Sequence, residues 1–245
     1  MAVLVTRPHP DGETTAAALR ARGFEVLEAP MLRFEPVIFR GDMDGRYGAV
    51  ILTSANALRG IEPRLKSHRL LELPLFAVGE HTAAAARRAG FTQVISAKGD
   101  ATDLRDLVLA SVKAKQLKGA STLLYLAGAE MARDLAGELG AHGLRVMTHA
   151  TYKMSPVTNL PREVCDAFAA NQIEAVLHYS QRSARAFIEA ARAAGVEISA
   201  LAVPQCCISA AVASVIRDAG AARVMVAESP DENALFRALE RALRP

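Results

Sequence analysis

The chain has 245 residues, of which 51% are hydrophobic, and it carries a formal net charge of +3. This length suits one large domain or two small ones with a sizeable core, and a mild charge without a stripe of Lys and Arg excludes a duplex nucleic-acid binder. The sequence has no run of 18 apolar residues and no secretory signal pattern at its start, so we expect neither a membrane span nor export.

Apolar runs alternate with amphipathic segments along the whole chain, which predicts an α/β protein with parallel strands and helices on both faces. Each amphipathic segment has helical spacing, and several end at a glycine. In chain order, the expected strands are 2–6, 24–27, 49–52, 75–78, 93–95, 122–126, 144–148, 175–178, 205–208 and 222–226.

The sequence repeats itself at long range. Residues 2–37 align with residues 122–157 without a gap, and both copies end in Pro-Val. All α/β units look somewhat alike, but a gapless register and a second matched pair favour duplication of two kinds of half, each used twice. The second pair matches 49–58 with 175–184 and 77–97 with 207–227.

The first kind of half contains two strands, too few for an independent sheet, so halves must pair across the chain. We therefore expect two flavodoxin-like parallel-sheet domains of about five strands each, interleaved in the sequence and joined by a two-stranded connector. Proline suits the extended edge positions of such a connector. Domain 1 would comprise 1–33 and 158–245, domain 2 would comprise 38–150, and the connector strands would be 32–37 and 151–157.

Open parallel sheets bind ligands beyond the carboxyl ends of their strands, where the next helices begin. The turns at these places contain no phosphate-binding loop and no dinucleotide fingerprint, so no nucleotide cofactor is expected. Arg7 follows the first strand and could bind a carboxylate, or it could be an ordinary surface arginine. The turns also carry hydroxyl side chains, which either cap the helices or help to present free N–H groups to carboxylates. These are Thr53, Ser54, Thr82, Ser180, Ser183 and Ser209.

Other catalytic groups find little support. The six histidines have no metal-binding spacing, and Ser54 and Ser180 lie outside GxSxG elbows, so neither a metal site nor a hydrolase triad is expected. His178 ends a strand, where we expect a satisfied, partly buried side chain. The three cysteines lack CxxC spacing and suit a reducing cytoplasm, and Cys206 and Cys207 are expected in the core.

The four tyrosines divide into two kinds. Tyr47, Tyr125 and Tyr179 abut strands and are expected to pack. Tyr152 lies on the predicted connector, at the mouth between the domains. There it either packs against a hinge or donates a proton in the cleft.

An ordered set of motifs over nearly the whole chain is similar to the uroporphyrinogen-III synthase family. The motifs are "VLVTRP", "ILTSANA", "AVGEHTAAAARRAGF", "TLLYLAG" with "RDLAGELGAHGLRV", and "ARVMVAESPDENAL". The resemblance implies two interleaved α/β domains joined by a two-stranded ladder, an active site in the cleft, and no metal or cofactor. It also implies a cyclising lyase, which closes the linear tetrapyrrole hydroxymethylbilane to uroporphyrinogen III with loss of water and inversion of ring D through a spiro intermediate.

The resemblance also assigns roles to residues. The connector tyrosine of the family, proposed as its proton donor, corresponds to Tyr152. Two positions depart from the family pattern: Ala127 stands where an arginine is frequent, and Ser209–Val212 replaces a turn that contains threonine. Arg7 is added to the substrate-binding residues because it follows the first strand. The matching turns imply the others, which are Thr53, Ser54, Ala55, Gly79, Thr82, Ser180, Gln181, Ser209 and Ala210.

Such an enzyme would work in haem, sirohaem or cobalamin biosynthesis, and we expect a cytoplasmic monomer with at most transient contact to the preceding pathway enzyme. The alternative is a cytoplasmic two-lobe solute-binding or sensor module that closes on its ligand without chemistry. Solute-binding proteins of this shape normally carry a secretory signal, which favours the enzyme.

Overall fold

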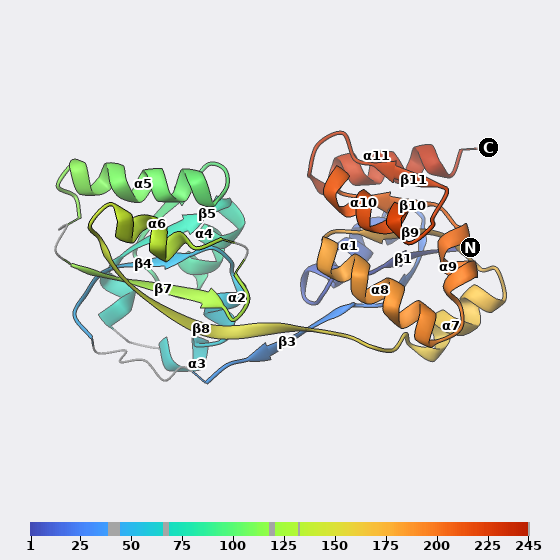
Figure 1. Ribbon diagram of the computed structural model, residues 1–245, viewed down its shortest axis with the longest axis horizontal. Helices are drawn as coiled ribbons and strands as arrows, with labels where there is room; N and C mark the ends of the chain where they lie inside the picture. Colours follow the sequence, from blue (N-terminus) through green and yellow to red (C-terminus); the bar gives the residue numbers. More distant parts are fainter. Residues whose placement is uncertain (39–44, 66–68, 118–120, 132, 245) are drawn as a thin grey trace. The chain divides into compact units, whose positions relative to one another are not determined.

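The protein is described by a computed structural model covering residues 1–38, 45–65, 69–117, 121–131 and 133–244. It forms two compact units, coloured along the chain in Figure 1. Unit 1 contains Met1–Phe34 and Ser155–Pro245, and unit 2 contains Glu35–Met154. The chain passes between the units twice, within strands β3 (Leu32–Pro36) and β8 (Arg145–Pro156).

Unit 1 is built on a five-stranded sheet with the order β11-β10-β9-β1-β2, in which each neighbouring pair is parallel. The central strand β1 aligns Leu4 with Leu27 on one side and with Val176 on the other. The strands are β1 (Ala2–Val5), β2 (Glu25–Glu28), β9 (Ile173–His178), β10 (Gln205–Cys207) and β11 (Val224–Val226).

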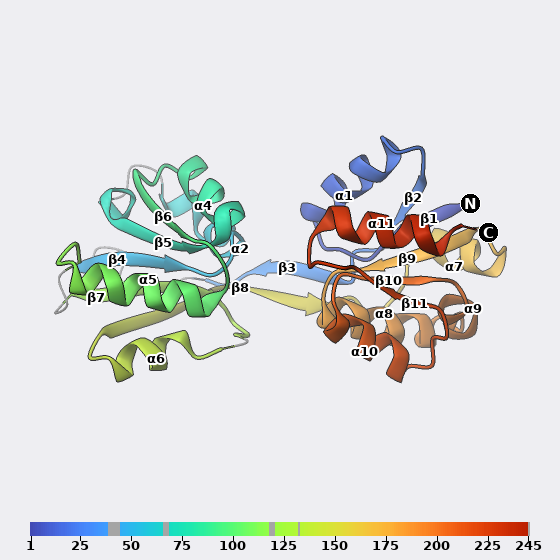
Figure 2. The same ribbon diagram turned by 90° about the horizontal axis from the view of Figure 1, so that it is seen from above.

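Helices cover both faces of this sheet, as Figure 2 shows. Alternate residues of β1 point to opposite faces, so Val3 and Val5 enter one core cluster and Leu4 enters the other. The first cluster is closed by α1 (Asp11–Arg20) and α11 (Glu232–Ala242). The second is closed by α7 (Arg162–Ala169), α8 (Gln181–Ala193), α9 (Glu197–Ala202) and α10 (Ala210–Asp218).

Unit 2 contains a six-stranded sheet with the order β3-β8-β7-β4-β5-β6. The new strands are β4 (Tyr47–Leu52), β5 (Pro74–Val78), β6 (Gln93–Ala97) and β7 (Thr122–Gly128). One face packs against α2 (Asn56–Arg59), α3 (Glu62–Leu65), the 3-10 helix η1 (Arg69–Glu72) and α4 (Gly79–Arg88). The other face packs against α5 (Ala101–Lys113) and α6 (Leu135–Ala141).

The two sheets share one strand order. The order β8-β7-β4-β5-β6 in unit 2 corresponds strand for strand to β2-β1-β9-β10-β11 in unit 1, which is the flavodoxin-like order. In each unit the first two strands come from one kind of half and the other three from the second kind. The prediction of two flavodoxin-like α/β sheets is therefore confirmed.

One prediction about the strands was wrong. Residues 144–148 were expected to form a strand separate from the connector segment 151–157, but both lie in the continuous strand β8 (Arg145–Pro156). The ladder between β7 and β8 runs from Thr122 opposite Arg145 to Gly128 opposite Tyr152, with one register shift near its end. Continuous pairing with β7 keeps the backbone extended, and β3 adds a sixth strand beside β8.

Cys206 and Cys207 are fully buried, as predicted, and burial raises the pKa of each thiol to about 12.

None of the helices in the described part of the chain combines the length and the apolarity that crossing a bilayer requires.

Candidate active site

The turns that follow the strands gather at the carboxyl edge of each sheet, because neighbouring strands are parallel. In unit 1, Arg7 follows β1, Ser180 follows β9 and Ser209 follows β10. In unit 2, Thr53 follows β4 and Gly79 follows β5. Each unit therefore brings its predicted site residues to one edge, and the pairing of β1 with β9 marks the switch point of the sheet in unit 1.

Two serines of unit 1, Ser180 and Ser209, are helix caps. Ser180 accepts a hydrogen bond from the N–H of Ser183 at 3.1 Å, and Ser209 accepts one from the N–H of Val212 at 3.4 Å. The capping interpretation is therefore confirmed for both. A cap satisfies one of the free N–H groups of a helix start, so others remain available to an anion. The two turns also touch, because Gln181 Nε2 donates to the carbonyl oxygen of Ala211 at 3.1 Å.

The turns of unit 2 differ in detail. The hydroxyl oxygens of Thr53 and Tyr125 lie 3.0 Å apart, and the hydroxyl of Ser54 accepts from the N–H of Asn56 at 3.2 Å. Gly79 begins α4 with a φ of +69°, a left-handed conformation that glycine adopts without strain. The residue before α4, Val78, makes no side-chain cap, so the first N–H groups of this helix are not satisfied by it.

Tyr152 lies on β8 beside the carboxyl end of β7 and belongs to unit 2. Its half-buried ring packs against the core cluster of that unit, and its carbonyl oxygen accepts from the N–H of Ala129 at 2.8 Å. Burial raises the pKa of the nearby Tyr125 phenol, a hydrogen bond with Thr53 opposes that rise, and the proximity of Tyr152 adds to it. Tyr125 and Tyr152 therefore form a neighbouring pair of phenols with Thr53.

A second group surrounds Arg7 in unit 1. Its guanidinium contacts Glu232 and Asp11, both at 3.2 Å, and lies 4.7 Å from the centre of the Tyr179 ring. Burial raises the pKa of the Tyr179 phenol well above its ordinary value. Tyr179 was expected only to pack, and Glu232 was not predicted at all. A glutamate in the first turn of the last helix is the signal that was available in the sequence.

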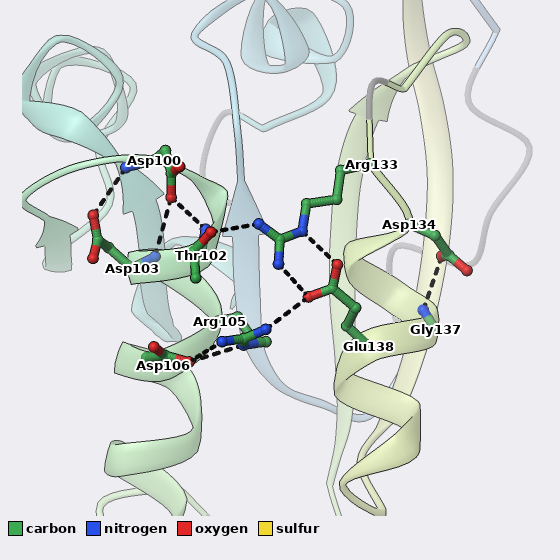
Figure 3. Close-up of polar contacts among 9 residues, drawn as sticks. All are labelled: Asp100, Thr102, Asp103, Arg105, Asp106, Arg133, Asp134, Gly137 and Glu138. Carbon is green, nitrogen blue, oxygen red and sulfur yellow. Dashed lines mark hydrogen bonds and ion pairs between the residues drawn. The ribbon is translucent and has the colours of Figure 1, made fainter.

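Unit 2 has its own arginine cluster, shown in Figure 3. Arg133 donates through Nε and Nη2 to both carboxylate oxygens of Glu138, and Arg105 donates to the same carboxylate at 3.2 Å. The Nη1 group of Arg133 donates to the hydroxyl of Thr102 near the start of α5. The cluster ties α5 to α6, and its arginines depress the pKa of the Glu138 carboxyl. Ala127, the in-register counterpart of Arg7, contributes no charge.

The burial of His178 differs from what the sequence predicted. The side chain is fully buried rather than partly buried, and Nε2 lies 2.9 Å from Oε1 of Gln205. Its Nδ1 has no hydrogen-bond partner among the described residues. Burial lowers the pKa of this imidazole to about 4, although the bond to Gln205 opposes the change.

The described residues give no metal-binding group at these turns, and a cavity of unit 1 lies elsewhere. Among the described residues, no group of three His, Cys, Asp or Glu side chains is placed to hold a metal ion. A cavity of about 920 Å³ in unit 1 opens at the amino ends of β1 and β2, where its lining includes Glu25 and Arg162. It lies at the edge opposite the βα turns, so we do not assign it to the site.

The family model described as "Uroporphyrinogen-III synthase HemD" matches residues 13–237. The chain belongs to the uroporphyrinogen-III synthase family. The match includes each turn named above except the one that carries Arg7, and it includes β8 with Tyr152. The family consists of cyclising lyases of tetrapyrrole biosynthesis. A comparison with curated proteins gives no match.

Solved structures of uroporphyrinogen-III synthases share the fold of this family member. The enzyme from Helicobacter pylori 26695 is 17% identical over 99% of both chains, with a TM-score of 0.66. A mutant enzyme from the extremely thermophilic bacterium Thermus thermophilus is 16% identical over 99% of both chains, with a TM-score of 0.58.

Proposed function

We propose that the protein is a uroporphyrinogen-III synthase, which converts hydroxymethylbilane to uroporphyrinogen III. The family match over residues 13–237 carries this proposal. The placement of hydroxyl-capped and uncapped helix starts at the carboxyl edges supports it. The substrate has acetate and propionate side chains on its rings, and helix N-termini bind such carboxylates through N–H groups and the helix dipole.

The proposed binding residues are those of the turns at the carboxyl edges. In unit 1 we assign Arg7, Ser180, Gln181, Ser209 and Ala210 to the substrate carboxylates. In unit 2 the corresponding residues are Thr53, Ser54, Ala55, Gly79 and Thr82. Many of these contacts would come from backbone N–H groups, so the chemistry depends on the turn geometry more than on individual side chains.

Tyr152 is our candidate for the general acid. It would donate its phenolic proton to the terminal hydroxyl of the substrate, the carbon–oxygen bond would break, and water would leave an electrophilic azafulvene. The substituted carbon of ring D would then attack and form a spiro intermediate. One carbon–carbon bond of that intermediate would break, and the ring would reclose in the inverted sense.

The proton balance closes within this scheme. The last closure releases a proton from ring D, which can return to the Tyr152 phenolate, so the net change is the loss of one water molecule. The substrate is neither oxidised nor reduced overall, so the steps need no redox partner. Closure without an enzyme gives the type I isomer, so the protein must mainly hold a conformation and stabilise the cationic azafulvene.

The same proposal places the protein in the cytoplasm, in the synthesis of haem, sirohaem or cobalamin, with the preceding pathway enzyme as a transient partner. The test is incubation with hydroxymethylbilane, followed by oxidation and separation of the porphyrin isomers. Type III product at a rate above that of buffer supports the proposal. Type I product alone, formed at the buffer rate, contradicts it, and binding without turnover would indicate a sensor module instead.

A further inference from the structure

Three donor side chains converge on one carboxylate oxygen at the carboxyl edge of unit 1. Arg7 Nη1, Thr15 Oγ1 and Tyr179 Oη donate to Oε1 of Glu232 at 3.2, 2.5 and 3.1 Å. Arg7 follows β1 and Tyr179 follows β9, so two of the donors stand at the switch point of the sheet. One cation and two hydroxyl groups are the donors that a carboxylate oxygen prefers.

Glu232 itself is not required to hold its helix. The start of α11 is capped by Asp231, which accepts from the N–H of Ala234 at 2.9 Å. The side chain of Glu232 is 32% exposed, and its second oxygen accepts no hydrogen bond from the described residues. Rotation of this side chain into water breaks three hydrogen bonds, so exchange is favourable only when another carboxylate takes up the same donors.

The charges around Arg7 also favour replacement of a bound carboxylate over addition of a third one. Arg7 faces Asp11 as well as Glu232, so one guanidinium already balances two carboxylates. A third carboxylate beside them would be repelled unless one of the first two leaves. Asp11 receives one hydrogen bond from Arg7, whereas the Glu232 position offers three donors to an incoming oxygen.

The arginine cluster of unit 2 shows the contrasting case (Figure 3). Glu138 accepts from Nε and Nη2 of Arg133 and also from Arg105, which in turn pairs with Asp106, so two guanidinium groups face two carboxylates. That arrangement joins two helices, so we do not expect a ligand carboxylate to displace Glu138. In unit 1 a single guanidinium group faces two carboxylates, and the Nε group of Arg7 has no acceptor among the described residues.

We propose that Arg7, Thr15 and Tyr179 form a carboxylate receptor that Glu232 occupies in the free protein, and that a carboxylate of the ligand displaces Glu232 on binding. The identity of that ligand as a tetrapyrrole rests on the proposed function. The receptor itself rests on the convergence of the three donors and on the excess of carboxylates over guanidinium groups around Arg7.

The decisive experiment measures binding of uroporphyrin III, the stable oxidised form of the proposed product, by its fluorescence. Glu232→Gln keeps the size of the side chain and removes its charge, so the occupant competes less. We expect this variant to bind uroporphyrin III about two- to fivefold more tightly than the wild type. Glu240→Gln is the matched control, because it removes the same charge from the same helix at an ion pair with Arg22, 3.9 Å away, and its affinity should stay unchanged.

Two variants probe the donors. Thr15→Val and Tyr179→Phe each remove one hydroxyl, and the second keeps the ring under Arg7, so both should weaken binding while the circular dichroism spectrum is unchanged. Tighter binding in Glu232→Gln together with weaker binding in the donor variants supports the receptor. Unchanged or weaker binding in Glu232→Gln overturns it, as does an absence of uroporphyrin III binding by the wild type and by Glu232→Gln.

Failure of this proposal can be told apart from failure of the function. If the type III isomer forms but Glu232→Gln binds uroporphyrin III as the wild type does, the receptor proposal is contradicted and the synthase proposal stands. If that variant binds uroporphyrin III more tightly but hydroxymethylbilane is not turned over, the synthase proposal is contradicted and the receptor proposal stands.

Discussion

The ring of Tyr152 lies directly against the backbone of Gly128. A Cβ atom placed on Gly128 would be 3.0 Å from Cζ and 3.1 Å from the hydroxyl oxygen of Tyr152. The glycine therefore leaves the space in which the phenol rests at the carboxyl end of β7.

Gly128→Ala tests the importance of that position. The methyl group forces the ring to move by a few tenths of an ångström, and we expect turnover to fall about tenfold, since small displacements of catalytic groups are costly. Gly140→Ala is the control: apart from its chain neighbours and the backbone of its own helix, no described atom lies within 4 Å of its added Cβ, and it sits inside α6. There we expect unchanged turnover and a gain of about 0.5–1 kcal/mol in the free energy of unfolding. Wild-type turnover in Gly128→Ala would show that the phenol position is unimportant.

Tyr152→Phe separates packing from proton donation. The ring stays in the core of unit 2 and only the hydroxyl is lost, so the melting temperature should hold while kcat falls by about 10²–10⁴ at most. Tyr47→Phe makes the same change at the amino end of β4 and should leave kcat intact. Steady-state assays with hydroxymethylbilane measure both. A Tyr152→Phe variant with full kcat would exclude the phenol as general acid.

Gly79→Ala tests the left-handed start of α4. The φ of +69° disfavours alanine, and we expect a loss of about 1–2 kcal/mol in stability together with a higher KM. Gly79→Asn should lose less stability despite its larger side chain, because asparagine tolerates this conformation. Thermal unfolding and substrate titration follow both variants. An alanine variant as stable as the wild type would contradict the conformational argument.

The burial of His178 predicts a pH dependence of stability. Its folded pKa of about 4 lies below the ordinary value of 6.5, so the unfolded chain binds more protons between these values. The stabilisation is present above pH 6.5 and is lost as the pH falls towards 4, by on the order of 3 kcal/mol in total.

Urea denaturation followed by far-ultraviolet circular dichroism at several pH values measures that loss, and long-range nitrogen–proton NMR reports the imidazole directly. His178→Leu should flatten the pH profile, whereas His142→Gln, at an exposed helix end, should not. An imidazole of His178 that titrates near pH 6.5 in the folded protein would contradict the prediction.

Local patterns in the sequence determined much of this protein. Strand and helix periodicity, with the gapless match of 2–37 to 122–157, predicted two flavodoxin-like sheets of about five strands each, because duplicated halves repeat the same hydrophobic spacing. The rule that ligand-binding turns follow parallel strands then selected Thr53, Ser180 and Ser209 without knowledge of any contact. These inferences needed only neighbours along the chain.

Tertiary structure alone decided which side chains meet. Arg7 and Glu232 are 225 positions apart, and Thr53 and Tyr125 are 72 apart; no spacing rule pairs them, because their proximity depends on which strands adjoin. The continuity of β8 and the full burial of His178 were also decided there. A strand ends where its neighbour stops pairing, and burial depends on what the opposite layer covers.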